Sequence, residues 1–240
     1  MSRAVVLLSA GLDSVVSFKI AFDTFDEIRC LTFDYAQKAN RIEIEYATKI
    51  CALYGVDHQI IKLPWYASFI GALTSQTTPP RMSDSALNDL AVTRDTARAV
   101  WVPARNAVFL SIAAAFCENF AFNTVVVGFN KEEAMTFPDN STDFVASFNE
   151  VLKYATLNEV EVFAPLNEYD KSEIAALGLR IGAPLEWSWS CYAAEGTPCC
   201  RCESCLRRRR AFQEICKDDP LLKRLRSRDK SPKNGCQSTR

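Results

Sequence analysis

Short runs of apolar, mostly β-branched residues alternate with amphipathic stretches along most of the chain. The apolar runs, bounded by polar or turn-forming residues, predict strands at residues 4–8, 28–33, 58–63, 124–128 and 160–164. The amphipathic stretches predict helices at residues 13–22, 40–54, 105–120, 143–154 and 171–179. Because strands that alternate with helices form parallel sheets, the pattern predicts an α/β fold with a doubly wound, mostly parallel sheet.

Two segments break this alternation. Residues 74–100 are polar and contain Pro79 and Pro80, and they predict a long loop or insertion. After Gly182 the sequence becomes rich in Trp and Cys and then ends in a basic helix. The pattern therefore divides the chain into an α/β domain at residues 1–185, a cysteine-rich segment with the basic helix at residues 186–216, and a flexible basic tail at residues 217–240.

The overall composition is that of a globular protein. Of the 240 residues, 48% are hydrophobic and 24% are charged, which excludes a disordered chain. No run approaches the roughly 18 apolar residues that a membrane helix needs. The first residues also lack the apolar core of a secretory signal. We therefore expect a cytoplasmic protein without membrane contact.

The net charge of −1 conceals a strongly basic C-terminal end. Residues 206–240 carry twelve Lys and Arg against four Asp and Glu, a net charge of +8 that leaves −9 for the rest. Either this end is a solvated helix and tail, or it attracts an anionic partner such as tRNA. Residues 207–210 are four consecutive arginines, which would point around a helix in all directions. Stable nucleic-acid binding is therefore not favoured.

A turn of small residues directly follows the first predicted strand. A strand, turn and helix in this order direct backbone N–H groups and the positive end of the helix at one point, where an anion can bind. Asp13 suits the cap of this helix and is also a candidate ligand for Mg²⁺. The lysine of a Walker loop is absent, and an ordinary capped helix would show the same pattern. The candidate nucleotide-binding residues are Leu8, Ser9, Ala10, Gly11, Leu12, Asp13, Ser14, Val15 and Ser17.

Four cysteines near the C-terminal end have the spacing of a metal site. Zn²⁺ accepts four thiolates in a tetrahedron, and a site closed in this way is structural rather than catalytic. Cys200 is an alternative to one of the four, although the resulting Cys-x-Cys pair is the poorer spacing. Reduced cysteines without metal and an iron–sulfur cluster also remain open. The preferred ligands are Cys191, Cys199, Cys202 and Cys205.

Several ordered motifs resemble one family. The turn SAGLDS at residues 9–14 is similar to the SGGxDS loop of PP-loop ATP pyrophosphatases. Within that superfamily, the chain resembles the 7-cyano-7-deazaguanine synthase family from residue 5 to about residue 212. The motifs that carry this resemblance are LTFDYAQ at residues 31–37, VPARN at 102–106, GFNKEE at 128–133, FPD at 137–139, PL at 165–166 and WSCY at 189–192, followed by PC at 198–199 and CESC at 202–205.

The resemblance implies a Rossmann-like PP-loop fold and an ATP-dependent carbon–nitrogen ligase of queuosine or archaeosine biosynthesis. Such an enzyme adenylates 7-carboxy-7-deazaguanine, and ammonia then displaces AMP to give the amide. A second activation dehydrates the amide to the nitrile, and each activation releases pyrophosphate. The resemblance also implies ATP, Mg²⁺ and Zn²⁺ as cofactors and a homodimer as the assembly.

The same resemblance assigns residues to the reaction. Arg105, Lys131 and Lys171 are the candidate cations, each of which is alternatively a surface charge, and Asp139 or Glu133 is expected to hold the guanine-like edge. The implied catalytic residues are Asp13, Ser14, Arg105 and Lys171. The implied substrate-binding residues are Phe33, Tyr35, Gln37, Arg105, Asn106, Lys131, Glu133, Phe137 and Asp139.

The chain departs from the family pattern at three positions. Ala10 and Ala36 replace glycines, and Asn140 replaces a cysteine. An alanine at position 10 is costly if the backbone there has a positive φ. A histidine that often follows Gln37 is also missing. The missing cysteine and histidine leave open a ligase that joins the activated acid to a protein amine. A PP-loop enzyme acting on tRNA, which only the basic tail specifically supports, and a nucleotide-binding module without catalysis are further alternatives.

Overall fold

A five-stranded parallel sheet forms the centre of the protein. The computed structural model describes residues 1–74, 77–193 and 196–228. The strand order is β3-β2-β1-β4-β5, and every neighbouring pair is parallel. This arrangement confirms the predicted fold class. The strands are β1 (Arg3–Leu7), β2 (Glu27–Asp34), β3 (Asp57–Lys62), β4 (Thr124–Val126) and β5 (Glu161–Phe163).

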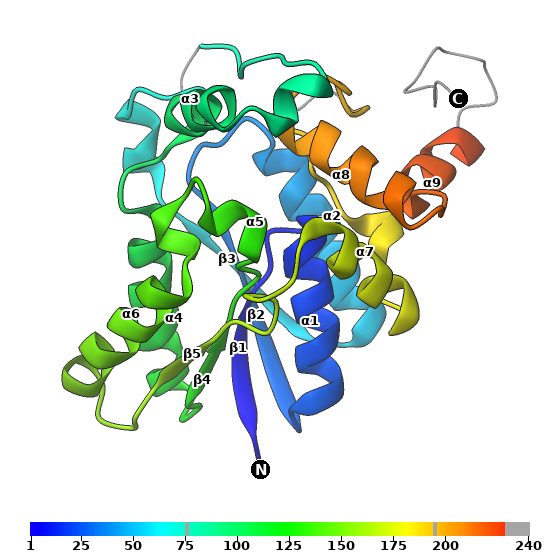
Figure 1. Ribbon diagram of the computed structural model, residues 1–240. Helices are drawn as coiled ribbons and strands as arrows, with labels where there is room; N and C mark the ends of the chain where they lie inside the picture. The colour runs from blue at the N-terminus through cyan, green and yellow to red at the C-terminus, as the bar shows by residue number, and fades with distance from the viewer. Residues whose placement is uncertain (75–76, 194–195, 229–240) are drawn as a thin grey trace.

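Helices cover both faces of this sheet (Figure 1). One face packs against α1 (Leu12–Thr24), α2 (Asn40–Tyr54) and α7 (Lys171–Arg180), and the other against α4 (Arg105–Asn119) and α6 (Thr142–Ala155). Alternate residues of β1 serve the two layers, because successive side chains of a strand point to opposite faces. Val6 is buried in the first layer and Val5 in the second.

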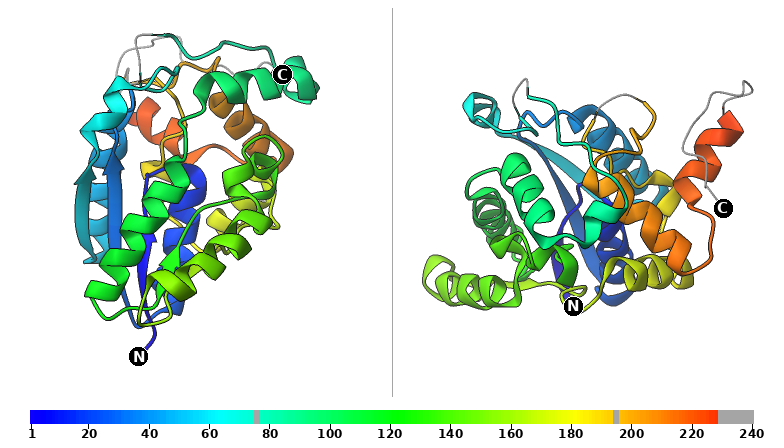
Figure 2. Two further views of the ribbon diagram at one scale, coloured as in Figure 1. Left: turned by 90° about the vertical axis from the view of Figure 1, so that its left-hand side faces the viewer. Right: turned by 45° about the horizontal axis from the view of Figure 1, so that its top comes forward.

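The segment expected to be a long loop contains helical structure. Residues 74–100 include the 3₁₀ turn η2 (Ser85–Asn88) and the helix α3 (Leu90–Val100), and η1 (Pro64–Ser68) precedes them. The side chain of Asp89 caps α3 by accepting from the N–H of Ala91. The buried face of α3 is formed partly by threonines, so hydrophobic periodicity did not reveal this helix. The segment lies over the carboxyl end of the sheet (Figures 1 and 2).

The C-terminal segment packs into the same core as the sheet. Helix α8 (Glu203–Glu214) leads into α9 (Pro220–Arg228), and Phe212 and Leu221 share the apolar cluster of Val6. Residues 217–228 are therefore not the flexible tail that we expected, because α9 buries Leu221 to 1% exposure. The remaining residues of that predicted tail, 229–240, lie outside the described part of the chain.

The four consecutive arginines of α8 are held by contacts within the protein. Arg207 pairs with Glu132 and Glu203, and Arg208 forms two hydrogen bonds with the carboxylate of Asp219. Arg209 and Arg210 both contact Asp84, at the carboxylate and the carbonyl oxygen respectively. Much of the local positive charge is thus neutralised internally, which weakens the interpretation of this helix as a surface for nucleic acid.

Within residues 1–74, 77–193 and 196–228, no single helix has the length and apolar character required to cross a membrane. Only the bent pair of α3 and α4, with 55° between the two axes, meets the length and composition limits when taken together. One face of α4 packs against the sheet and buries Leu110 and Ala113.

Candidate active site and cysteine cluster

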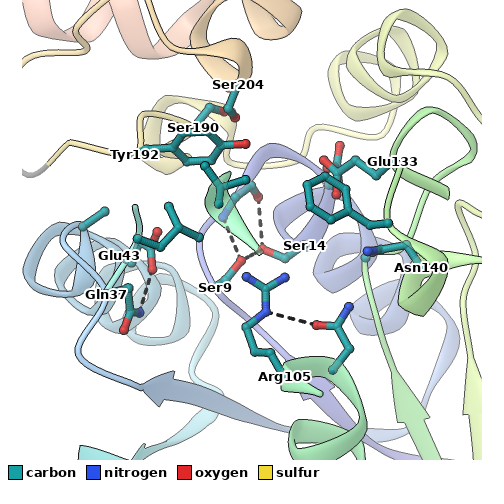
Figure 3. A pocket seen from close by; sticks show the side chains of 18 of the residues that line it. Ser9, Ser14, Gln37, Glu43, Arg105, Glu133, Asn140, Ser190, Tyr192 and Ser204 are labelled. Atoms are coloured by element: carbon teal, nitrogen blue, oxygen red, sulfur yellow. Dashed lines mark hydrogen bonds between the residues drawn. The ribbon is translucent and has the colours of Figure 1, made fainter. Parts of the chain in front are cut away.

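A cavity of about 270 Å³ opens at the carboxyl end of the sheet. Its walls come from the turn after β1, the ends of β2 and β4, the first turn of α4 and the cysteine-rich segment (Figure 3). Four of the predicted site residues do not line the cavity: Ala10, Val15, Ser17 and Lys131. The predicted residues that line the cavity are Leu8, Ser9, Gly11, Leu12, Asp13, Ser14, Phe33, Tyr35, Gln37, Arg105, Asn106, Glu133, Phe137, Asp139 and Lys171.

The turn between β1 and α1 leaves the start of the helix open toward the cavity. Gly11 is the cap residue and supplies no side-chain hydrogen bond to the first turn of α1. The N–H groups of that turn have no acceptor inside the helix, so they can bind an anion. Ser9 Oγ accepts from Gly11 N at 3.2 Å and donates to Ser14 Oγ at 3.1 Å. Two hydroxyls therefore stand beside the helix N-terminus.

Ala10 adopts a left-handed backbone conformation, with φ of +58°. This conformation is costly for a residue with a Cβ. Two contacts offset the cost: the methyl group is fully buried, and the carbonyl accepts a hydrogen bond of 2.7 Å from Trp189 N. The turn is thereby tied to the cysteine-rich segment, which lies about 180 residues further along the chain.

Ala36 is a second alanine in the left-handed region, with φ of +63°. Its side chain is only partly buried, so little packing offsets the strain. We expect Ala36→Gly to stabilise the protein by about 0.5 kcal/mol. Glycine relieves the left-handed strain, and this gain exceeds the cost of its greater conformational entropy in the unfolded chain. The control Ala146→Gly, at an exposed position within α6, is expected to destabilise it by about 1 kcal/mol. Urea unfolding measures both, and a loss of stability in Ala36→Gly would contradict the strain argument.

One lysine joins two carboxylates next to this turn. Lys171 Nζ, from the first turn of α7, lies 2.6 Å from Asp13 Oδ2 and 2.9 Å from Glu133 Oε1. Asn130 donates to Asp13 Oδ2 at 3.1 Å and caps the short helix α5 (Lys131–Ala134), which carries Glu133. The cap of α7 is Asp170, which forms a capping box with its third residue. The structure thus brings together three residues from distant parts of the sequence.

Burial and charge act in opposite directions within this cluster. Burial raises the pKa of Asp13 to about 6, and the charge of Lys171 only partly opposes this. Burial alone would also raise the pKa of Glu133, but Lys171 and Asn130 outweigh it and lower that pKa. The pKa of Lys171 is raised because its two carboxylate partners outweigh its own burial. At neutral pH the cluster therefore holds one ammonium and two carboxylates.

The opposite part of the cavity is aromatic. Phe33 stacks on Phe109 with 4.0 Å between ring centroids and 5° between planes. Tyr35 meets the same ring edge-on at 5.4 Å, and its hydroxyl accepts from Arg105 Nη1 at 3.3 Å. Arg105 Nε in turn donates to Asn106 Oδ1 at 3.3 Å. A flat wall and a fixed guanidinium are therefore adjacent, a combination that suits a planar anion.

Gln37 lines the cavity, and its side chain is hydrogen-bonded to neighbouring residues of the protein. Its side-chain oxygen accepts from Tyr35 N at 2.9 Å, and its amide nitrogen donates to Phe33 O at 3.0 Å and to Glu43 Oε2 at 2.9 Å. These hydrogen bonds fix the Gln37 side chain against the backbone of Phe33 and Tyr35. Gln37 therefore positions Glu43 within the cavity wall. Lys131 differs from the prediction, because its side chain is exposed and lies outside the cavity.

The four preferred cysteines form one cluster. The Sγ atoms of Cys191, Cys199, Cys202 and Cys205 all lie within 4.8 Å of one another. Four thiolates on one Zn²⁺ ion would be about 3.8 Å apart, the edge of a tetrahedron with Zn–S bonds of about 2.3 Å. Cys199 N donates to Cys191 Sγ at 3.3 Å, and Cys202 N donates to Cys199 Sγ at the same distance. Such bonds stabilise thiolates, so the donor set fits a bound metal ion.

Comparison with known proteins shows the family of this chain. A family model described as "Queuosine biosynthesis protein QueC" matches residues 3–216. The chain belongs to the QueC family. The 7-cyano-7-deazaguanine synthase of Methanosarcina barkeri is 46% identical over 228 residues, which cover 93% of this chain and 99% of that protein. The enzyme of the same name from Pelotomaculum thermopropionicum is 44% identical, over 85% of this chain and 94% of that protein. Among solved structures, NMN synthetase from Francisella tularensis aligns with a TM-score of 0.47 and 15% identity, over 99% of this chain and 90% of that one.

The departures from the QueC pattern can now be placed. Ala10 and Ala36 occupy turns at the ends of β1 and β2, both with the positive φ that suits glycine. Asn140 lies in the cavity wall with 4% exposure and donates to Asp139 Oδ1 at 3.3 Å. A thiol at that position would be a weaker donor and a stronger nucleophile. The substitution therefore places an amide, rather than a nucleophile, in the cavity wall of this QueC chain.

Sequence reasoning missed several residues of this cavity in the QueC chain. Phe109 and Trp101 were assigned no role, because apolar residues next to or within a helix are indistinguishable from core residues by periodicity. Ser190, Tyr192 and Ser204 flank the cysteines and line one wall (Figure 3). Two signals could have suggested them: their short distance along the chain from the predicted metal ligands, and their place within the motifs at residues 189–192 and 202–205.

Proposed function

We propose that this chain is an ATP-dependent ligase that converts 7-carboxy-7-deazaguanine and ammonia to 7-cyano-7-deazaguanine. The acid is adenylated with release of pyrophosphate, and ammonia displaces AMP to give the amide. A second ATP adenylates the amide oxygen, and loss of AMP and a proton leaves the nitrile. The observation that supports this proposal most strongly is one cavity that joins an open helix N-terminus to an aromatic wall with a fixed guanidinium. Membership of the QueC family agrees with it.

The residues of the turn have a direct role in this proposal. The N–H groups at the start of α1, with the hydroxyls of Ser9 and Ser14, bind the two terminal phosphates that leave as pyrophosphate. Arg105 orients the substrate carboxylate toward the α-phosphorus, and Asn106 holds the guanidinium. Lys171 stabilises the negative charge that develops beside the turn. The protein contributes mainly by holding two anions together at a fixed geometry.

A magnesium ion fits beside the turn in this proposal. Asp13 Oδ1 is buried and has no hydrogen-bond partner among the described residues, so one carboxylate oxygen remains for a ligand. Mg²⁺ prefers such oxygens together with phosphate oxygens and water. When bound, the ion would neutralise phosphate charge.

The cysteine cluster is proposed to hold a structural Zn²⁺ ion. Four protein ligands leave no open position for catalysis. The ion would fix the segment that carries Ser190 and Tyr192 into the cavity wall and Trp189 onto the carbonyl of Ala10. Metal binding would therefore support the nucleotide site at a distance.

Loss of the metal is expected to weaken both the fold and ATP binding. We expect about one Zn²⁺ per chain, and Cys205→Ser should remove most of it. The thermal midpoint should fall by roughly 10 °C, and the KM for ATP should rise because Trp189 is no longer fixed. The control Cys216→Ser, at an exposed cysteine outside the cluster, should keep the metal. Metal analysis and calorimetry test this, and full metal content in Cys205→Ser would contradict the ligand set.

A single incubation tests the proposed reaction. Purified protein is mixed with ATP, Mg²⁺, 7-carboxy-7-deazaguanine and an ammonium salt, and the products are identified by mass spectrometry. We expect AMP, pyrophosphate and the nitrile. Adenylate or amide without nitrile would favour transfer to a protein amine, and AMP release only with tRNA would favour a tRNA-modifying enzyme. Absence of AMP under all these conditions would overturn the proposal.

A cytoplasmic homodimer without stable nucleic-acid binding completes the proposal. Its support is the resemblance to the family together with the internal pairing of the arginines at residues 207–210. Light scattering during size-exclusion chromatography tests the dimer, and a monomer at micromolar concentration would contradict it.

A further inference from the structure

The carboxylates that line the cavity are not equivalent. Asp13 and Glu133 share the ammonium of Lys171, and Glu203 is paired with Arg207. Glu43 forms no ion pair with any described residue. Its charge is therefore available to a ligand, whereas the charges of Asp13, Glu133 and Glu203 are already partly neutralised. Asp139, the fifth carboxylate of the cavity wall, also lacks an ion pair among the described residues, but it is buried and its Oδ1 accepts from Asn140 at 3.3 Å.

The structure fixes Glu43 through Gln37. The Gln37 amide donates to Glu43 Oε2 and to the Phe33 carbonyl, while its oxygen accepts from Tyr35 N. These bonds to the backbone set the amide in one orientation, so the carboxylate is held without a counter-charge. Glu43 Oε1 makes no hydrogen bond within the described residues and belongs to a side chain of the cavity wall. A rigid acceptor pair directed at a cavity is suited to recognition of adjacent N–H donors.

The surroundings of Glu43 suit a flat heterocycle with an anionic group. In Figure 3, Glu43 and Gln37 lie on one side of the cavity, and Ser9 and Ser14 lie near its centre. Glu133 and Asn140 lie on the opposite side. Phe33, whose ring stacks on Phe109, lies near the end of β2. Tyr35, whose hydroxyl accepts from Arg105, directly follows that strand. Burial raises the pKa of Glu43 to about 6, against the effects of Gln37 and Arg105, so the carboxylate is ionised above that pH.

We propose that Glu43 is a specificity-determining residue that accepts two adjacent N–H donors from the pyrimidine edge of the deazaguanine. This inference rests on the proposed function and deepens it. A guanine-like edge presents a ring N–H next to an exocyclic amino group, both of which a carboxylate can accept. An adenine-like edge presents one amino donor beside an acceptor nitrogen, which a carboxylate repels. Glu43 thus selects the guanine-like heterocycle over adenine-like ones, and it takes the role that we had expected of Asp139 or Glu133.

Kinetics with Glu43→Gln test this inference. The variant keeps the size of the side chain and removes its charge. We expect the KM for the deazaguanine acid to rise about 30-fold, the effect of losing charge-assisted hydrogen bonds, and the KM for ATP to change by less than about twofold. Glu45→Gln, at an exposed position of the same helix α2, is the matched control and should change neither KM.

An analogue of the acid that lacks the 2-amino group locates the contact. Wild-type protein should bind this analogue about tenfold more weakly than the acid in calorimetry without ATP, and Glu43→Gln should bind the two equally. If Glu43→Gln does not fold, Glu43→Asp, which keeps the charge but withdraws it by one methylene, should raise only the KM for the acid. A raised KM for ATP, or full discrimination by Glu43→Gln, would overturn the inference. Failure of the proposed function would differ, because wild-type protein would then form no AMP.

Discussion

Lys171→Met is expected to abolish measurable pyrophosphate release and to destabilise the fold. The lysine is the only cation among the described residues within salt-bridge distance of Asp13 and Glu133. Its removal leaves the buried carboxylate of Asp13 and the partly exposed carboxylate of Glu133 without compensation, which costs about 3 kcal/mol. The same change removes the positive charge beside the phosphate turn, and we expect AMP formation to fall about 1,000-fold. Urea unfolding and a pyrophosphate assay measure the two effects.

The pH dependence of the stability of Lys171→Met shows whether the loss comes from the missing charge or from altered packing. Without Lys171, the pKa of Asp13, already raised to about 6 by burial, should rise further, and the lowered pKa of Glu133 should rise too. Protonation then neutralises both groups as the pH falls. The difference in unfolding free energy between wild type and Lys171→Met should therefore shrink from about pH 8 to about pH 5. An equal loss of unfolding free energy at both pH values would contradict the electrostatic explanation. The control Lys131→Met, at an exposed position of α5, should show no loss at either pH.

Gly128→Ala is expected to impair ATP binding by moving the first turn of α1. A Cβ at this position would lie 2.7 Å from Ser14 N and 2.9 Å from the carbonyl carbon of Asp13, both backbone atoms. The turn must shift to avoid this overlap, which costs about 1–3 kcal/mol of stability. Since the displaced N–H groups are those proposed to bind phosphate, we expect the KM for ATP to rise about 100-fold.

Gly178→Ala is the matched control for this effect. Its Cβ would meet Val16 Cγ2 at 2.8 Å, at the contact of α7 with α1 beyond the first turn. We expect a comparable loss of stability in urea unfolding but little change in the KM for ATP. If both variants raised that KM equally, the effect of Gly128→Ala would be general destabilisation rather than displacement of the phosphate turn.

Elements with strong periodicity were predictable from local sequence. Helix α2 begins and ends where its amphipathic pattern predicts, and β2 extends the predicted strand by one residue at each end. Helix α3 was missed because its buried face includes Thr93 and Thr96. Helix α9 was missed because basic residues surround its few apolar positions, of which Leu221 is fully buried.

The candidate site was predictable only in part. The turn at residues 9–14 and the four cysteines are compact motifs, so short spacings along the chain were sufficient to predict them. The pairing of Lys171 with Asp13 spans 158 positions, and no local pattern carries such a contact. Glu43 resembles any other glutamate of an amphipathic helix until the fold directs it toward the cavity beside Gln37.

The sequence by itself thus determined the alternation of strands and helices that builds the sheet, the candidate phosphate turn and the cluster of four cysteines, because each depends on residues close together in the chain. Only the tertiary structure decided which charges are used internally and which face the cavity. Arg207 and Arg208 are bound within the protein, whereas Glu43 has no counter-ion among the described residues. The physical reason is that the ionisation and availability of a charged group depend on its burial and on partners that folding brings from distant parts of the chain.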